Sequence, residues 1–341
     1  MDVSRDYTIP TLDDVARQAG VSTATVSRCL NGSQKVTDKT REKVMQAVEA
    51  LGYTPNFGAR AMAARRTYTM GAIIPTMENA IFARGVQAFQ EQLHKGGYTL
   101  LVSSSAYRPE LEAEQVRALV ARGADALLLI GYDRNPSVYE HLERRGMPYL
   151  LAWAYNKDSP HPAIGFDNRA SMATLTGAVL DKGHRDIAII SGIVAGNDRA
   201  AERLRGIREC LAARGLDPDK APMIETPYEI ENGANAFETL MQADQRPTVV
   251  MCVNDVLAVG AMQRARDMGL EVPGDVSITG FDDIELARIV TPQLTTVHVP
   301  HREMGRLAAQ ELMHMLDDAR PGVSTELQSK VCLRGSLRAL D

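Results

Sequence analysis

Aromatic residues and cysteine are scarce in this sequence, and long apolar runs are missing. Of its 341 residues only 5% are aromatic, with a single tryptophan, and the four cysteines show no C-x-x-C spacing. Scattered cysteines exclude the disulfide framework of a small secreted domain and are typical of reduced thiols inside cells. The apolar runs, such as Ala126–Ile130, are far shorter than the ~20 residues of a membrane-spanning helix. The polar N-terminus has no apolar core of a secretory signal, so we expect a soluble cytoplasmic protein with no membrane partner.

The motifs that mark the common enzyme classes are missing as well. The sequence has no G-x-G-x-x-G dinucleotide fingerprint, no G-x-x-x-x-G-K-[ST] phosphate loop, no G-x-S-x-G elbow and no H-E-x-x-H zinc motif. Its seven histidines are scattered, and the one close pair, His298 and His301, has no further histidine or cysteine beside it to complete a metal site. We therefore predict no enzymatic activity, no catalytic residue, no bound metal and no cofactor.

The remaining composition is ordinary for a globular chain, but its charge is unevenly divided. The shares of hydrophobic (45%) and charged (24%) residues exclude a disordered or collagen-like polypeptide, and at roughly 100–200 residues per domain the length favours two or three domains. The net charge of −5 argues at first against a nucleic-acid partner. Residues 1–66, however, hold ten Lys/Arg against seven Asp/Glu, a balance of +3, and the remainder holds 28 against 36, a balance of −8. A small basic segment therefore precedes a large acidic one.

The basic segment begins with the pattern of three short helices. Thr11 and Asp14 form a capping-box arrangement at the start of the first helix, and Gly20 ends it. Ser22 caps the second helix, and Thr37 opens the third. Two short helices joined by a three- or four-residue turn that contains glycine are the helix-turn-helix pattern.

The second helix has the composition of a DNA-reading element. Opposite its apolar stripe it presents Thr23, Ala24, Ser27 and Arg28. Arg28 is the one residue there that can reach the O6 and N7 edge of guanine bidentately, and the small neighbours suit a close approach to a thymine methyl group. The alternative is an adaptor or capping bundle, which three short amphipathic helices can also form.

An alanine- and arginine-rich segment follows Pro55. At about nine residues, the stretch 56–64 is too short to form a stable helix alone, since isolated helices need roughly 12–15 residues. It would fold when a partner supplies the missing contacts, and Met62 is its one long apolar side chain, suited to wedge between base pairs. A plain flexible linker is the alternative.

The run TLDDVARQAGVSTATVSRCLNGSQKVTDKTREKVMQAVEALGYTPNFGARAMA resembles the head of the LacI/GalR transcriptional regulators. The resemblance implies major-groove contacts from the second helix, phosphate contacts around it, and a hinge helix that enters the minor groove. In that family the wedge position is usually Leu, and Met62 departs from it. The DNA-binding residues are then expected to be Thr11, Ser22, Thr23, Ala24, Thr25, Ser27, Arg28, Asn31, Thr37, Asn56, Ala59 and Met62.

From Tyr68 onward short apolar strands alternate with amphipathic helices. Near-continuous apolar strands joined by helical crossovers predict parallel sheets covered on both faces, and about 270 residues of this rhythm exceed one such domain. We therefore predict an α/β body of two lobes. The expected strands are residues 69–75, 98–104, 124–130, 147–153, 186–192, 247–253 and 275–281, with helices over 84–94, 110–121, 170–182, 202–214 and 255–268.

Polar and aromatic side chains stand at the carboxyl ends of these strands, where open parallel sheets bind ligands. Together they describe a pocket for a polyhydroxylated small molecule. Each has a structural alternative, because an asparagine or aspartate there can simply cap a helix, a phenylalanine can be core and an arginine can be exposed. The expected effector-binding residues are Asn79, Phe82, Trp153, Arg205, Asn254 and Asp282.

The resemblance to the LacI/GalR family continues to about residue 337 and implies a periplasmic-binding-protein-type fold, with two lobes linked by three crossovers. It places Val256 and His301 near the effector. The family's lactose-type members have polar residues where this chain has Trp153 and Val256, so the effector is not expected to be a galactoside. The runs IGFDN and PHREMG are similar to gluconate-operon repressors of the family.

The sequence thus predicts an N-terminal all-α helix-turn-helix domain and an α/β, periplasmic-binding-protein-like effector domain. We divide the chain into the helix-turn-helix domain at 1–54, a hinge helix or linker at 55–67 and a two-lobed effector-binding and dimerisation domain at 68–341. A homodimer would repress a carbohydrate or sugar-acid operon from a pseudo-palindromic operator, under control of a sugar or sugar acid such as gluconate. The alternatives are an activator or co-repressor-dependent regulator and, more remotely, an α/β sugar-processing enzyme. A transport-type sugar-binding protein would need a signal peptide and no basic head.

Overall fold

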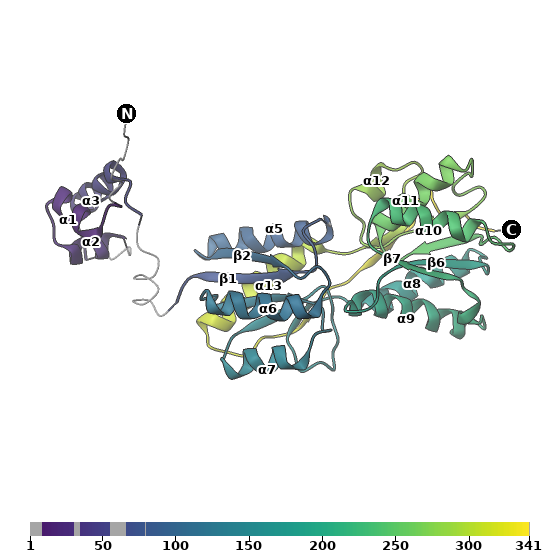
Figure 1. Cartoon of the computed structure of the whole chain (residues 1–341), viewed down its shortest axis with the longest axis horizontal. Coiled ribbons are helices and arrows are strands. Elements are labelled where there is room, and N and C mark those ends of the chain that lie inside the picture. The colour runs from purple at the N-terminus through teal and green to yellow at the C-terminus, as the bar shows by residue number, and fades with distance from the viewer. Residues whose placement is uncertain (1–8, 31–34, 55–65, 79, 341) are drawn as a thin grey trace, which may run out of the picture. The chain divides into compact units, whose positions relative to one another are not determined.

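The computed structural model describes residues 9–30, 35–54, 66–78 and 80–340 of the chain (Figure 1). The chain divides into two compact units, unit 1 at residues 1–67 and unit 2 at residues 68–341, and each is considered by itself. Five of the predicted site residues lie outside the described residues: Asn31, Asn56, Ala59, Met62 and Asn79.

Unit 1 is a bundle of three helices, α1 (Leu12–Ala19), α2 (Thr23–Leu30) and α3 (Asp38–Leu51). The capping box at Thr11 is formed, since its side chain accepts from the Asp14 N–H and the Asp14 carboxylate accepts from the Thr11 N–H. Gly20 then ends α1 in the left-handed conformation, which costs glycine least. The three helices bury one valine each, Val15, Val26 and Val44, in a common core.

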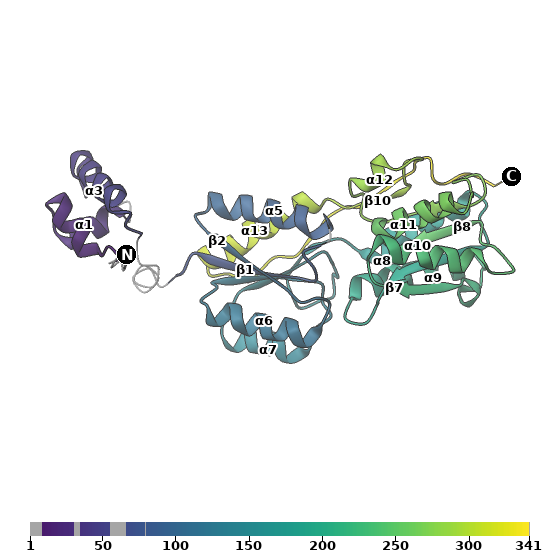
Figure 2. The ribbon, with the colours of Figure 1, turned by 45° about the horizontal axis from the view of Figure 1, so that its top comes forward.

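Lobe 1 of unit 2 is built on a six-stranded parallel sheet in the order β11-β5-β4-β3-β1-β2. Helices α5 and α13 pack together on one face of the sheet, and α6 and α7 cover the other face (Figure 2). Because both faces are covered, β3 is buried at every residue, as its unbroken apolar sequence predicted. The elements are β1 (Thr69–Ile74), α5 (Ala80–Lys95), β2 (Thr99–Ser104), α6 (Pro109–Ala121), β3 (Ala126–Ile130), α7 (Pro136–Arg144), β4 (Tyr149–Ala152), β5 (Ala163–Gly165), α13 (His301–Asp317) and β11 (Thr325–Glu326).

Lobe 2 has a four-stranded parallel sheet in the order β7-β6-β8-β9. Alternate residues of β6 face different helices: Ile187 and Ile189 belong to the core shared with α8 and α9, and Ala188 and Ile190 to the core shared with α10 and α11. The elements are α8 (Asn168–Asp181), β6 (Ile187–Gly192), α9 (Asp198–Ala213), the 3₁₀ helix η1 (Pro218–Lys220), β7 (Met223–Thr226), α10 (Ile230–Met241), β8 (Val249–Cys252), α11 (Asp255–Asp267), β9 (Ser277–Thr279) and α12 (Leu286–Ile289).

The chain passes between the two lobes three times: between β5 and α8, between α12 and α13, and after β11 (Figure 1). Two of these passages carry β10 (Thr296–His298) and β12 (Lys330–Cys332), which pair antiparallel with each other. The parallel sheets, the two lobes and the three crossovers predicted for the body are therefore present. Among the described residues, no helix is long and apolar enough to cross a membrane.

Candidate ligand cavity and DNA-reading helix

A small cavity lies where the carboxyl ends of the strands of the two lobes face each other. Lobe 1 contributes the start of α5, the loop after β2 and the end of β4; lobe 2 contributes α9 and the loops after β7 and β8. The cavity is lined by Ile81, Phe82, Tyr107, Trp153, Asn197, Arg199, Arg203, Tyr228 and Asn254.

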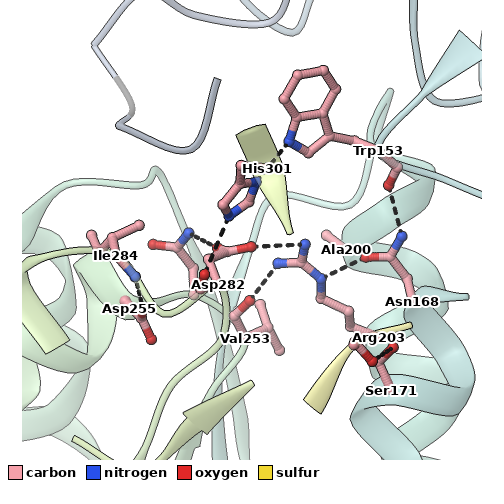
Figure 3. Close-up of polar contacts among 12 residues, drawn as sticks. Trp153, Asn168, Ser171, Ala200, Arg203, Val253, Asp255, Asp282, Ile284 and His301 are labelled. Atoms are coloured by element: carbon pink, nitrogen blue, oxygen red, sulfur yellow. Dashed lines mark hydrogen bonds and ion pairs between the residues drawn. The ribbon is translucent and has the colours of Figure 1, made fainter. Parts of the chain in front are cut away.

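Arg203 on α9 is the central cation of the cavity wall and is only 6% exposed. Its Nε donates to Asn168 Oδ1 at 2.8 Å, its Nη1 to the carbonyl of Val253 at 2.8 Å, and its Nη2 to Asp282 Oδ1 at 3.4 Å (Figure 3). The Phe281 ring lies beneath the guanidinium, 3.9 Å from ring centre to Cζ. Since each of its three nitrogens donates to the protein and the Phe281 ring covers one face, the guanidinium is fixed in direction before any ligand arrives.

Asp282 is the buried partner of that arginine and follows β9. Its second oxygen accepts from Asn254 Nδ2 at 2.8 Å. Burial raises the pKa of the Asp282 carboxyl to about 6, although the positive charge of Arg203 acts in the opposite direction. Its backbone φ of 110° lies in a region that residues other than glycine rarely adopt, and such strain is concentrated at functional sites.

Asn254 is both a helix cap and a member of this polar cluster. Its Oδ1 accepts from the Val256 N–H at 2.7 Å at the start of α11, while its amide donates to Asp282. Asn254 therefore caps a helix, which was the structural alternative to a binding role, and at the same time belongs to the polar cluster at the cavity. The neighbouring Asp255 is purely internal: its carboxylate accepts from Thr296 Oγ1 at 2.6 Å and from the Ile284 N–H at 2.9 Å.

Trp153 and His301 connect this cluster to lobe 1 (Figure 3). Trp153 Nε1 lies 3.2 Å from His301 Nδ1, and His301 Nε2 lies 3.2 Å from the Asp282 carbonyl oxygen. The indole N–H can only donate, so Nδ1 accepts and the proton of the imidazole is on Nε2, from where it donates to the carbonyl. Burial lowers the pKa of His301 to about 3, which keeps the ring neutral. Trp153, at φ 62°, packs against Phe82 with ring centres 5.5 Å apart.

Arg205 does not lie with the other predicted residues, and its placement is corrected to Arg203. The side chain of Arg205 is 58% exposed and pairs with Glu202 at 2.9 Å, one turn back on α9. An α-helix turns by 100° per residue, so two residues along it a side chain points to nearly the opposite side. The signal that could have found Arg203 is helical spacing: it lies on the same face as the buried residues Ala200 and Ile207.

Direct contacts between the lobes surround the cavity. The Tyr132 N–H of lobe 1 donates to Asp198 Oδ2 of lobe 2 at 2.6 Å, and Arg199 Nη1 donates to the Ile130 carbonyl at 3.3 Å. Tyr107 and Tyr228 meet across the lobes with ring centres 6.0 Å apart. Arg84 of α5 pairs with Glu285 at another point of the interface. None of these pairs was predicted, because they join segments far apart in the sequence.

In unit 1, α2 presents the predicted DNA-reading residues on its outer face. Ala24 and Arg28 are exposed, and Thr23, Thr25 and Ser27 are half-buried, while Val26 and Cys29 face the core. Ser22 Oγ accepts from the Thr25 N–H at 3.3 Å and Thr37 Oγ1 from the Thr40 N–H at 3.4 Å, so both exposed hydroxyls sit at helix N-termini. Such termini, with their free N–H groups, suit phosphate oxygens.

Comparison with known proteins finds similarity along the whole chain. Residues 11–56 match the family described as bacterial regulatory proteins, lacI family, and residues 176–337 match the periplasmic binding protein-like domain. The chain is 32% identical to the HTH-type transcriptional repressor PurR of Vibrio campbellii, over 97% of this chain and 99% of the relative. It is also 32% identical to the ribose operon repressor of Haemophilus influenzae, over the same shares. The crystal structure of the Lac repressor dimer bound to operator and the anti-inducer ONPF superposes with a TM-score of 0.87 at 26% identity, covering 97% of this chain and all of the other.

Proposed function

This chain belongs to the lacI family of bacterial regulatory proteins, and we propose that it represses a carbohydrate or sugar-acid operon in response to a small molecule bound between its two lobes. LacI-family members are DNA-binding transcriptional regulators controlled by effectors, and they are not enzymes. What is specific to this proposal is which residues act and what kind of effector they bind. Because operator DNA is the partner, the place of action is the cytoplasm.

Base recognition is assigned to α2. Arg28 is exposed near the end of this helix and, among the described residues, its guanidinium has no protein partner. It can therefore reach a guanine edge, while Thr23 and Ala24 permit close approach to the groove. Thr11, Ser22, Thr25, Ser27 and Thr37 are proposed to hold phosphates.

The hinge is assigned to residues 55–67, the final segment of unit 1. We propose that Asn56 and Ala59 contact the minor groove, that Met62 wedges between base pairs at the operator centre, and that Asn31 holds a phosphate. All four residues lie outside the described residues. The support for them is the sequence pattern of the family and the general use of apolar wedges by minor-groove binders.

The effector site is assigned to the cavity between the lobes, and the observation that carries the assignment is the fixed guanidinium of Arg203. It is held by Asn168, Val253 and Asp282 and lines the cavity beside Asn254. Trp153 and Phe82 supply an apolar wall, as pockets for sugar rings require. Arg203 replaces Arg205 in the proposed set, and Asn79 stays in it.

Control of DNA binding is proposed to pass through the relative position of the lobes. An effector changes operator affinity only if it binds one lobe arrangement better than the other, and operator binding must then change effector affinity by the same factor. A homodimer would set two α2 helices on a pseudo-palindromic operator. A sugar or sugar acid is the proposed effector; gluconate is one candidate, favoured only by the short runs IGFDN and PHREMG.

Selection of DNA from a random pool tests this proposal and yields the operator sequence at the same time. The full-length protein is incubated with random duplexes, bound sequences are enriched, and the affinity for the consensus is measured by fluorescence anisotropy. We expect a pseudo-palindrome, and we expect Arg28→Ala to lose the preference at one base pair of each half-site. If no sequence is enriched, or if parent and variant enrich the same sequence with equal affinity, the assignment of α2 is wrong.

Adding a sugar and sugar-acid panel to the same anisotropy assay tests the effector half of the proposal. A compound that weakens operator binding is an inducer, and one that strengthens it is a co-repressor. Arg203→Gln should abolish the response and retain operator binding, whereas Arg205→Gln should leave both unchanged.

A further inference from the structure

Arg199 is a second arginine in the wall of the ligand cavity. It lies four residues before Arg203 on α9, and residues spaced by four share one face of a helix. The two residues are 7% and 6% exposed, so both positive charges are almost withdrawn from solvent. A buried arginine needs hydrogen-bond acceptors for its N–H groups. The N–H groups that have no acceptor in the protein are therefore available to a ligand.

Protein acceptors bind only some of the N–H groups of each guanidinium. Arg199 donates from Nη1 alone, to Asp198 Oδ1 at 2.8 Å and to the Ile130 carbonyl at 3.3 Å. Among the described residues, no acceptor meets its Nε or Nη2. Arg203 makes one bond from each of its three nitrogens, and a guanidinium has five N–H groups. Both side chains therefore keep N–H groups for a ligand in the cavity that they line.

The charge of the cavity wall is positive. Its described lining contains two arginines, two asparagines and two tyrosines, but no acidic side chain. Asp198 and Asp282 contact the arginines without lining the cavity themselves, and each also accepts a second hydrogen bond, from the Tyr132 N–H and from Asn254. The arginines act on the hydroxyls around them as well: burial raises the pKa of Tyr107 and Tyr228, and both guanidinium charges oppose the rise.

We propose that the effector is an anion, with a carboxylate or phosphate group held between Arg199 and Arg203. This inference rests on the proposed function of the cavity as the effector site. Planar guanidinium groups bind carboxylate and phosphate through paired N–H donors, more strongly than they bind neutral oxygens. With a neutral polyol, the free N–H groups of Arg199 would face hydroxyl groups only. Its positive charge would then have Asp198 as its one anionic partner.

Arg199 also links this anion to the arrangement of the lobes. Its Nη1 contacts the Ile130 carbonyl of lobe 1, and Gly131 leaves room for it: a Cβ at Gly131 would lie 2.1 Å from that nitrogen. An anion on the free edge of Arg199 therefore binds to a residue that already bridges the two lobes. A ligand without the anionic group would lack this connection.

The emission of Trp153 provides a direct test, because it is the chain's single tryptophan and lines the cavity. The full chain is titrated with acetate, inorganic phosphate, D-gluconate and D-glucose 6-phosphate, and with the neutral D-glucitol and D-glucose, at constant ionic strength. We expect saturable changes with anions, and at least about ten-fold tighter binding of an anion than of its neutral counterpart, as one charge-assisted hydrogen bond provides. The carboxylate and phosphate arms show which group the site takes.

Two variants on α9 sharpen the test. Arg199→Gln should reduce anion affinity about ten-fold and leave affinity for the neutral compounds unchanged, and Arg199→Lys should fall between the two. Arg208→Gln is the matched control, because Arg208 is exposed on the same helix and pairs with Asp219. The inference is overturned if neutral compounds bind as tightly as the anions, if no anion changes the emission, or if both Arg199 variants bind anions like the parent.

Operator affinity measured in the same samples separates this inference from the proposed function. A neutral compound that releases or strengthens operator binding refutes the anionic effector and supports the regulator. An anion that binds through Arg199 without changing operator affinity supports the anion site and contradicts the regulatory proposal.

Discussion

Replacing His301 by glutamine isolates the effect of one buried imidazole on the acid stability of unit 2. The ring accepts from Trp153 Nε1 and donates to the Asp282 carbonyl, so it must be neutral in the folded protein. Burial lowers its pKa from 6.5 to about 3. Glutamine offers one acceptor and one donor at similar reach but does not titrate.

The sign and size of the effect follow from the two pKa values. The unfolded chain binds a proton at His301 below its ordinary pKa of 6.5, whereas the folded chain does not until about pH 3. The contribution of His301 to stability is therefore fully present above pH 6.5 and is lost as the pH falls toward 3. At about 1.36 kcal/mol per pKa unit, roughly 3 kcal/mol is lost between pH 7 and about pH 4.

Urea unfolding followed by Trp153 emission measures this loss for unit 2 alone, because the only tryptophan of the chain lies there. We expect the parent to lose about 3 kcal/mol more unfolding free energy than His301→Gln between pH 7 and pH 4. Other groups titrate equally in both proteins, including Asp282, whose raised pKa acts in the opposite direction, and they cancel in the difference. Parallel pH profiles would show that His301 is not a neutral buried bridge.

Three further predictions concern DNA reading, the cavity and the lobe contact. Arg28→Ala should cost about 1–3 kcal/mol of affinity for the selected operator and little for random DNA, measured by anisotropy; equal losses on both would refute base recognition. Arg203→Gln should lower the free energy of unfolding by about 3–5 kcal/mol by leaving a buried carboxylate unpaired, whereas Arg205→Gln should change it by less than about 0.5 kcal/mol; similar values in denaturant titrations would contradict their placement. Gly131→Ala should lower the free energy of unfolding by about 1–3 kcal/mol, because its φ is 71° and the added methyl group meets Arg199. It should also change effector affinity in calorimetry, and an unchanged affinity would show that this contact does not influence the effector site.

Local patterns in the sequence were enough to predict unit 1. The capping box at Thr11 and the glycine at the end of α1 depend on residues within one or two helical turns of each other. The long strands of unit 2 were equally clear, since β3 is apolar throughout. Short strands such as β5 and β11 have too few residues to show a period, and their pairing joins positions about 160 residues apart in the chain.

The cavity was predicted in part, and the limits have a physical cause. Phe82, Trp153 and Asn254 follow strands or begin helices, so strand-end reasoning finds them, and all three line the cavity. The choice between Arg203 and Arg205 depends on which face of α9 points to the cavity. An error of two residues in the helical phase selects nearly the opposite face. Arg199 lines the cavity with these residues only because the two lobes face each other, and no short sequence motif predicts how the lobes are arranged.

The three crossovers also determine the order in which the chain can complete its folding during synthesis. The sheet of lobe 1 begins with β1, but α13, which covers one of its faces, and β11, which pairs with β5, are made only after all of lobe 2's helices. Lobe 2 in turn needs Ser336 and Leu340, since the Leu340 N–H donates to the Lys182 carbonyl and the Ser336 hydroxyl to the Ile278 carbonyl. Lobe 1 cannot be completed before β11 has been synthesised, and lobe 2 cannot be completed before residues 336–340 have been synthesised. A nascent chain that stops short of α13 exposes the apolar sheet face which Met304, Ala308 and Leu312 would cover, and such surfaces aggregate.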